Sequence, residues 1–286
     1  MTNTDPGAPE YEFDWQNPNL KKFDVGRVVS STFRALRNNP VQFLILTLIG
    51  SGLPMMLFSL WPLLLGMGEG INLYDPTWAE DIEWEGILIP AIAIYTVFIL
   101  FAIVMYGALV QMSVNALSNR SVKIGESIRT GVRLFFPLLG ISILACVGIM
   151  IGFVLLIIPG IFLMLGWMLS TQVRVIEGGT VTGALSRSWS LTKGYKRWLL
   201  LMLIIFTVLG AVIGLVFQIP ILFFGNPQTA IINGGSTPFW ILNAIASGLA
   251  QMVTAALTYV GITATYLEIR RVKEGVESNK IADIFS

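Results

Sequence analysis

The most chemically suggestive group of side chains is a basic cluster that contains a tryptophan: Arg187, Trp189, Lys193 and Arg197. Basic groups attract anionic lipid, and tryptophan concentrates at the boundary between membrane and water. These four residues are therefore a candidate site for a lipid headgroup. The alternative is that the basic residues only fix the orientation of the chain in a membrane. The sequence leaves both interpretations open.

Two further sets of polar residues have a suggestive spacing or placement. Arg174 and Glu177 lie three residues apart, so their side chains can pair if one helix carries both. Four amides lie inside apolar segments: Gln111, Gln218, Asn243 and Gln251. Such amides can line a polar cavity for a solute, but more often they form hydrogen bonds between membrane helices. The sequence favours that structural role.

The composition excludes several kinds of reactive site. The chain has no histidine and one cysteine, Cys146, which excludes His-based zinc sites, His-containing triads and internal disulfides. The acidic loop over residues 69–85 has oxygens for a divalent cation, but its spacing matches no calcium loop and favours a solvated segment. No acid–base pair or nucleophile can be assembled, so we expect no enzymatic activity and no cofactor. The net charge of +1 provides no basic surface for nucleic acid.

The elements that must position these residues are membrane helices. Hydrophobic residues make up 55% of the 286 residues, charged residues make up 12%, and the mean hydropathy is +0.75. A soluble domain carries about 25% charged residues. Apolar runs near the length that crosses a bilayer occupy residues 40–65, 87–112, 137–158, 161–176, 199–224 and 239–266. The sequence predicts an all-α polytopic membrane protein with six transmembrane helices.

The basic residues predict the orientation of these helices. All 18 lysine and arginine residues lie in segments on one predicted side, while the opposite loops, 66–86, 159–160 and 225–237, have none. Because basic residues stay on the cytoplasmic side, both termini are predicted to be cytoplasmic. Residues 137–176 either cross the membrane twice or form a re-entrant hairpin, and the sequence leaves this open.

A short amphipathic stretch precedes each pair of predicted spans. The three stretches, 24–36, 123–135 and 180–192, each place apolar residues on one helical face and basic residues off it. We interpret them as three copies of a unit in which a cytoplasmic interfacial helix leads into a membrane hairpin, although ordinary linkers with basic residues are the alternative. The predicted domains are a disordered segment 1–22, a membrane domain 23–274 and a tail 275–286.

The third stretch resembles a known family. Residues 177–197 read EGGTVTGALSRSWSLTKGYKR, and together with Ile158-Pro159-Gly160-Ile161 and the ending ATYLEIRRVKEG they resemble the membrane-domain family associated with glycerophosphoryl diester phosphodiesterases. The resemblance implies a bacterial inner-membrane protein. It does not imply catalysis, because those enzymes resemble soluble barrels that use histidine, and a barrel of about 250 residues does not fit in this chain.

These observations predict a non-enzymatic inner-membrane protein that interacts with or organises lipid, or a membrane partner, through its basic interfacial helices. The expected partners are membrane lipids, anionic ones on the cytoplasmic face. Glycine pairs with GxxxG spacing, 148/152 and 210/214, indicate close helix packing within one chain or between two, so a homo-oligomer is also open. The alternative function is a transporter or flippase for a lipid-like or weakly polar solute, using the four amides.

Overall fold

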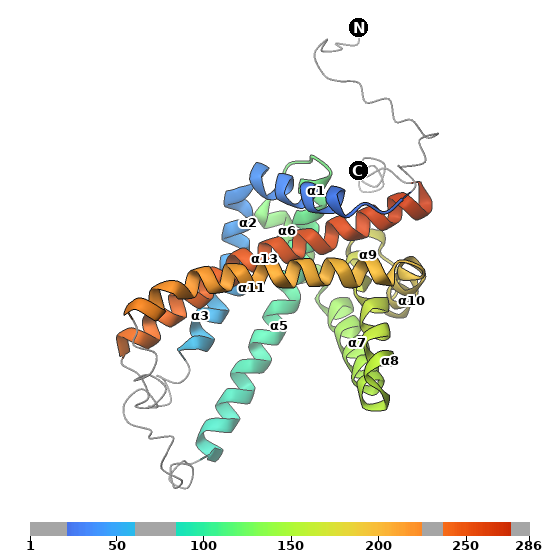
Figure 1. The fold of residues 1–286 in the computed structure, drawn as a ribbon. Helices are drawn as coiled ribbons and strands as arrows, with labels where there is room; N and C mark the ends of the chain where they lie inside the picture. Colours follow the sequence, from blue (N-terminus) through green and yellow to red (C-terminus); the bar gives the residue numbers. More distant parts are fainter. Residues whose placement is uncertain (1–21, 61–83, 225–236, 276–286) are drawn as a thin grey trace, which may run out of the picture.

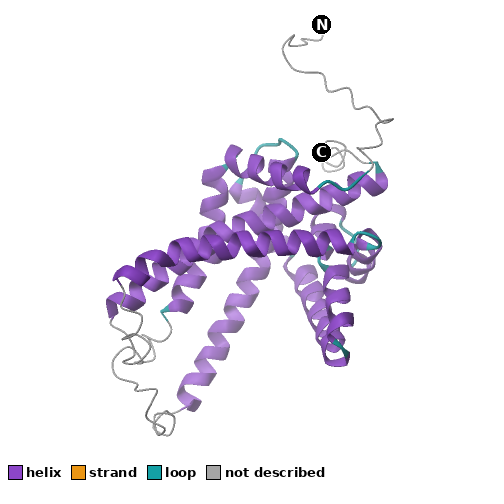
Figure 2. Ribbon diagram, in the orientation of Figure 1, coloured by secondary structure: helices purple, strands orange, loops and turns teal. Residues whose placement is uncertain are grey.

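The computed structural model describes residues 22–60, 84–224 and 237–275 (Figure 1). The predicted segment 1–22, the tail 275–286 and the acidic loop 69–85 lie almost wholly outside these ranges. Within them, the regular elements are all helices (Figure 2). The predicted all-α class is therefore confirmed.

Six helical segments are long and apolar enough to cross a membrane, as the sequence predicted. They are α2–η2–α3 (Pro40–Thr47, Leu48–Gly52, Leu53–Ser59), α5 (Trp84–Leu117), α7 (Phe135–Leu155), α8–α9 (Ile157–Trp167, Ser170–Glu177), α11 (Lys196–Phe224) and α13 (Thr237–Glu274). Their apolar side chains are widely exposed, as lipid contact requires.

The segment that the sequence left open contains α7, α8 and α9. Helix α7 has 21 residues, and the span formed by α8 and α9 also has 21. At 1.5 Å per residue, 21 helical residues extend about 31 Å, close to the thickness of the hydrocarbon core, although α8 and α9 are separated by Met168 and Leu169. These lengths favour two full crossings over a shallow re-entrant hairpin.

Three short helices precede spans: α1 (Val25–Asn38), α6 (Ile124–Arg133) and α10 (Val181–Thr192). Two of them begin at side-chain caps, because the Asp24 carboxylate accepts from the Arg27 N–H and the Thr180 hydroxyl accepts from the Gly183 N–H. We call the end of the molecule formed by α1, α6, α9, α10 and the last turns of α13 the basic end. The tips of α5 and of the α7–α8 pair lie at the other end (Figure 1).

The six spans do not all pack in sequential pairs. Helix α7 packs along α8, and α11 packs along α13, but the first span packs mainly on α13 and only slightly on α5. Away from the basic end, α5 diverges from the other helices (Figure 1). The predicted grouping into three hairpins stays a prediction.

Close glycine contacts hold several of these helices together within the chain. A Cβ on Gly148 would lie 2.4 Å from the Trp167 ring, and a Cβ on Gly152 would lie 3.0 Å from the Cα of Gly160. Gly210 likewise faces Thr254 of α13, with 2.7 Å to its methyl group, whereas Gly214 has nothing within 4 Å. Three of the four predicted packing glycines therefore contact helices of the same chain.

Candidate functional site

A carboxylate at the end of α9 joins three helices at the basic end. One oxygen of Glu177 accepts from Arg187 Nε of α10 at 2.9 Å, and the other accepts from the Tyr266 hydroxyl of α13 at 2.6 Å. Arg270 Nε lies 3.7 Å from the same carboxylate. The predicted partner of Glu177, Arg174, is not one of these groups. The local i,i+3 pairing is replaced by contacts with helices that are distant in sequence.

Glu274, in the last turn of α13, completes this ion-pair network. It accepts from Arg270 Nε at 3.0 Å and from an amino group of Arg187. Burial opposes the charge on Arg187, but its hydrogen bonds to Glu177 and Glu274 outweigh burial, so the pKa of its guanidinium is raised. Arg187 therefore holds α10 against α9 and α13 through these two ion pairs.

A second network holds α1 on α13. The side chain of Glu268 is only 7% exposed, and it accepts from Arg27 Nη2 at 3.0 Å and from Arg271 Nη2 at 2.9 Å. The Asp24 N–H donates to the same carboxylate at 3.2 Å. Together, these two networks form what we call the paired seam, in which Glu177, Glu268 and Glu274 hold Arg27, Arg187, Arg270 and Arg271.

The structure separates the predicted headgroup cluster into different environments. Arg187 belongs to the paired seam. Trp189 packs on Gly166, with Lys196 Nζ 3.6 Å from its ring, so it is part of a helix contact. Lys193 and Arg197 are exposed, and Arg197 lies 5.4 Å from the Trp198 ring. Of the four residues, two exposed cations remain available to a ligand.

A cavity of about 500 Å³ opens beside the paired seam, between α5, α6, α7 and α9. Its polar lining comprises Gln111, Thr130, Arg133, Arg174 and Glu177. Within the described part of the chain, Arg174 Nε is buried and has no hydrogen-bond partner. Arg174 and Glu177, which the sequence predicted as a pair, therefore both line this cavity, which we call the arginine cavity.

The four predicted amides do not line this cavity together. Gln111 lines the arginine cavity and donates to Asn115 at 3.3 Å, whereas Gln218, near the far end of α11, donates to Ser247 of α13 at 3.2 Å. Asn243 is half-buried and Gln251 is exposed. The Gln218 contact is the interhelical hydrogen bond that the sequence favoured.

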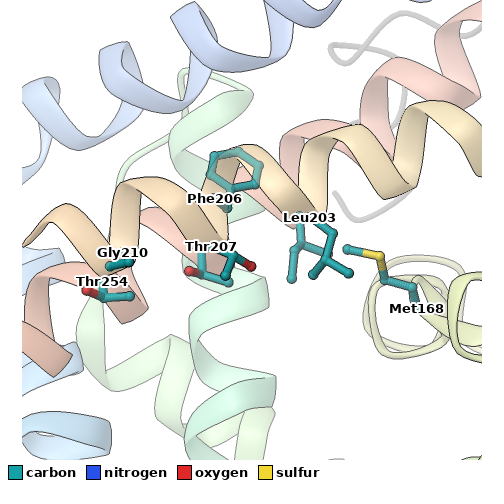
Figure 3. Close-up of a pocket in the computed structure, with 9 residues that line it drawn as sticks. Met168, Leu203, Phe206, Thr207, Gly210 and Thr254 are labelled. Atoms are coloured by element: carbon teal, nitrogen blue, oxygen red, sulfur yellow. The ribbon is translucent and has the colours of Figure 1, made fainter. Parts of the chain in front are cut away.

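A different cavity, of about 390 Å³, lies between α11 and α13 (Figure 3). Met168, Leu203 and Phe206 supply apolar walls, and Thr207 and Thr254 are among its few polar residues. Beneath α1, a third cavity of about 410 Å³ is lined almost entirely by apolar side chains. Neither has a charged residue in its lining.

Only part of the signal for these sites is present in the sequence. Tyr266, Arg270 and Glu274 occur in the ATYLEIRRVKEG ending, but nothing local shows that they meet Glu177. Arg133 lies near the end of the amphipathic stretch 123–135. Nothing in the sequence distinguished it from Arg129 as a residue that lines a cavity. No cluster of three metal-binding side chains occurs within the described ranges.

A family model described as a domain of unknown function, DUF7847, matches residues 87–269, which is more than half of the chain. The chain belongs to the DUF7847 family. The DUF7847 region contains the arginine cavity and three of the seven residues of the paired seam, Glu177, Arg187 and Glu268, but not α1 or the first span. The match does not support the resemblance to the phosphodiesterase membrane-domain family. No curated protein and no solved structure matches the chain.

Proposed function

We propose that the protein is a non-enzymatic integral membrane protein whose basic end binds anionic lipid. The observation that carries this proposal is a set of exposed cations that the carboxylates of the described chain leave without an ion pair. They lie on or beside all three short helices: Arg34, Arg37, Arg129, Arg133, Lys193 and Arg197. Each cation near an anionic membrane surface contributes about 1 kcal/mol to binding.

Exposed apolar side chains accompany these cations. Phe33 on α1 is 49% exposed, Val132 on α6 is 59% exposed and Phe136 at the start of α7 is 79% exposed. An apolar side chain beside a cation suits the boundary between headgroups and acyl chains, because the cation contacts the headgroups and the apolar side chain contacts the acyl chains. This supports an interfacial position for α1 and α6.

The proposed location is a cell inner membrane, with both termini and the basic end cytoplasmic. Its support is the asymmetry of charge, because basic residues are retained on the cytoplasmic side. Within the described ranges, the exposed cations lie near the starts of α2, α7 and α11, and not near the tips of α5 and α8. A homo-oligomer or a membrane-protein partner remains compatible with this arrangement.

Lipid retention tests the proposal directly. The full chain is reconstituted with equal amounts of phosphatidylcholine and phosphatidylglycerol, extracted in mild detergent, and the retained lipids are counted by native mass spectrometry. The variant R34Q/R37Q/K193Q/R197Q should lose most of the preference for phosphatidylglycerol. The matched variant R34K/R37K/R197K keeps every charge and should retain the preference. Equal lipid retention by both variants and the unmodified chain would contradict the proposal.

The alternative function, a transporter or flippase for a lipid-like or weakly polar solute, has less support. It depended on a cavity shared by the four amides, but Gln111 shares the arginine cavity with none of the other three. The Gln218 amide already donates a hydrogen bond to Ser247. Transport of a fluorescent lipid by reconstituted protein would restore this alternative.

A further inference from the structure

We infer that the arginine cavity is a specific binding site for a phosphate group, carried either by a lipid headgroup or by a free phosphate. This site shares Arg133 with the exposed cations of the proposed function, but it differs from them because it is a defined cavity between packed helices. It does not depend on general attraction to an anionic surface, so either inference can fail without the other.

The first argument is the state of Arg174. Its Nε is buried and finds no acceptor among the described residues, although the side chain lines a cavity of about 500 Å³. A buried donor without an acceptor is costly, and the cost is larger for a charged group. The same side chain lines the cavity, so an anion there can accept from the amino groups of the Arg174 guanidinium and balance its charge. Phosphate suits this role because its oxygens match the planar array of guanidinium donors.

The second argument is the presence of a second cation on another helix. Arg133, in the last turn of α6, lines the same cavity and has no carboxylate within ion-pair distance in the described chain. Gln111 of α5 also lines it and has an amide N–H in addition to the one donated to Asn115. Donors from three helices therefore face a common space, as in a site that holds a multivalent anion.

The third argument is the balance of charge around Glu177. Although this carboxylate lines the cavity, one oxygen is bound by Arg187 and the other by Tyr266, and Arg270 lies 3.7 Å away. Its negative charge is thus compensated from the paired seam. Arg133 and Arg174 then give the cavity a net positive charge that favours phosphate.

The cavity also has an apolar part. Leu134, Pro137 and Val175 line it beside the polar groups, and Leu134 and Pro137 lie at the start of the α7 span. This lining accommodates the glycerol or first acyl carbons of a lipid, while a small phosphate ester needs only the polar part. The shared chemistry is the phosphate group, and the two sources are separated by experiment.

The test uses the full chain in phosphatidylcholine nanodiscs, with two probes. Inorganic phosphate is titrated by isothermal calorimetry, and short-chain phosphatidic acid is titrated in parallel by native mass spectrometry. At least one probe should bind with a stoichiometry of one per chain. Binding of phosphate alone identifies a soluble ligand, whereas binding of phosphatidic acid with little response to phosphate identifies a lipid.

Variants assign the binding to the cavity. R174Q and R133Q should each weaken binding of the responding probe by about tenfold or more, the effect of losing a charge-assisted hydrogen bond. K123Q is the control, because Lys123 is an exposed cation at the start of the same helix that pairs with Glu126 and does not line the cavity. It should leave binding unchanged. R174K keeps the charge without the guanidinium fork, so its affinity should fall between those of the unmodified chain and R174Q.

Two results would overturn the inference. One is the absence of saturable binding of both probes to the unmodified chain. The other is an equal effect of K123Q and R133Q, which would assign binding to general surface charge. Helical content and thermal midpoint, measured for every variant, exclude misfolding as the cause of lost binding. If R174Q does not fold, the comparison of R133Q with K123Q decides the question alone.

Discussion

The paired seam and the arginine cavity use the same cation in opposite ways. In the paired seam, four arginines meet three carboxylates: Arg27, Arg187 and Arg270 each join one helix to another, and Arg271 adds a contact within α13. In the arginine cavity, Arg133 and Arg174 face a space in which the single carboxylate is already bound from the other side. The number of basic residues therefore does not distinguish structural from ligand-binding regions; the placement of the few carboxylates does.

The comparison predicts that breaking the paired seam costs the most stability. E268Q leaves Arg27 and Arg271 facing a neutral amide at a position where the Glu268 side chain is 7% exposed. Loss of one partner from a buried ion pair costs about 3 kcal/mol. The thermal unfolding of the purified protein, followed by circular dichroism, measures this loss. The control E126Q removes the exposed Lys123–Glu126 pair, which contributes about 0.5 kcal/mol or less. Equal midpoints for the two variants would mean that the seam has no special energetic role.

A second prediction concerns the helix that carries Arg133. A Cβ on Gly131 would lie 2.2 Å from the Val104 carbonyl oxygen of α5, so α6 and α5 can contact each other only because this residue has no side chain. G131A should destabilise the protein by about 2 kcal/mol through overpacking. It should also weaken phosphate binding, because α6 must move away from α5 and takes Arg133 with it.

The matched control for this substitution lies on the same helix. A Cβ on Gly125 meets nothing within 4 Å, so G125A gains helix propensity without a clash. It should raise stability by up to about 1 kcal/mol. If G131A unfolds at the same temperature as G125A, the close approach of α6 to α5 does not position the cavity.

A third prediction concerns the residue that belongs to both regions. E177Q removes the carboxylate that compensates Arg187, and it also removes the one negative group from the cavity lining. We expect a loss of about 1 to 2 kcal/mol in stability, because the Glu177 side chain is 22% exposed and its partners are partly hydrated. Phosphate binding should tighten by about threefold, the effect of a partly screened charge. Weaker binding in E177Q would show that the contacts of Glu177 with Arg187 and Tyr266 are needed to keep the cavity in its binding shape.

The spans and the class of fold were predictable from sequence because each depends on a local property. A run of about 20 apolar residues specifies a membrane helix whatever surrounds it. The caps of α1 and α10 are local in the same sense, since Asp24 and Thr180 contact backbone only three residues away. Such features can be read along the chain without knowledge of tertiary contacts.

The candidate site was only partly predictable because its contacts are not local. Glu177 stood out as a motif residue, but its partner Tyr266 is 89 residues away and Arg187 is on the next helix. An i,i+3 pair gains only about 0.5 kcal/mol or less, so these tertiary partners outcompete Arg174. Gln111 and Gln218 have similar polarity in sequence, but they lie near the ends of different helices and line no common cavity.

The smallest predicted effect separates the two regions most clearly. R133Q should change the free energy of unfolding by about 0.5 kcal/mol or less, because no carboxylate loses its partner and repulsion with Arg174 is relieved. R187Q, the same substitution in the paired seam, leaves Glu177 and Glu274 without their shared guanidinium and should cost about 2 kcal/mol. Denaturant or thermal unfolding of the two variants in the same detergent measures the difference. A stability loss in R133Q as large as in R187Q would mean that Arg133 holds the fold together, and the distinction between seam and cavity would disappear.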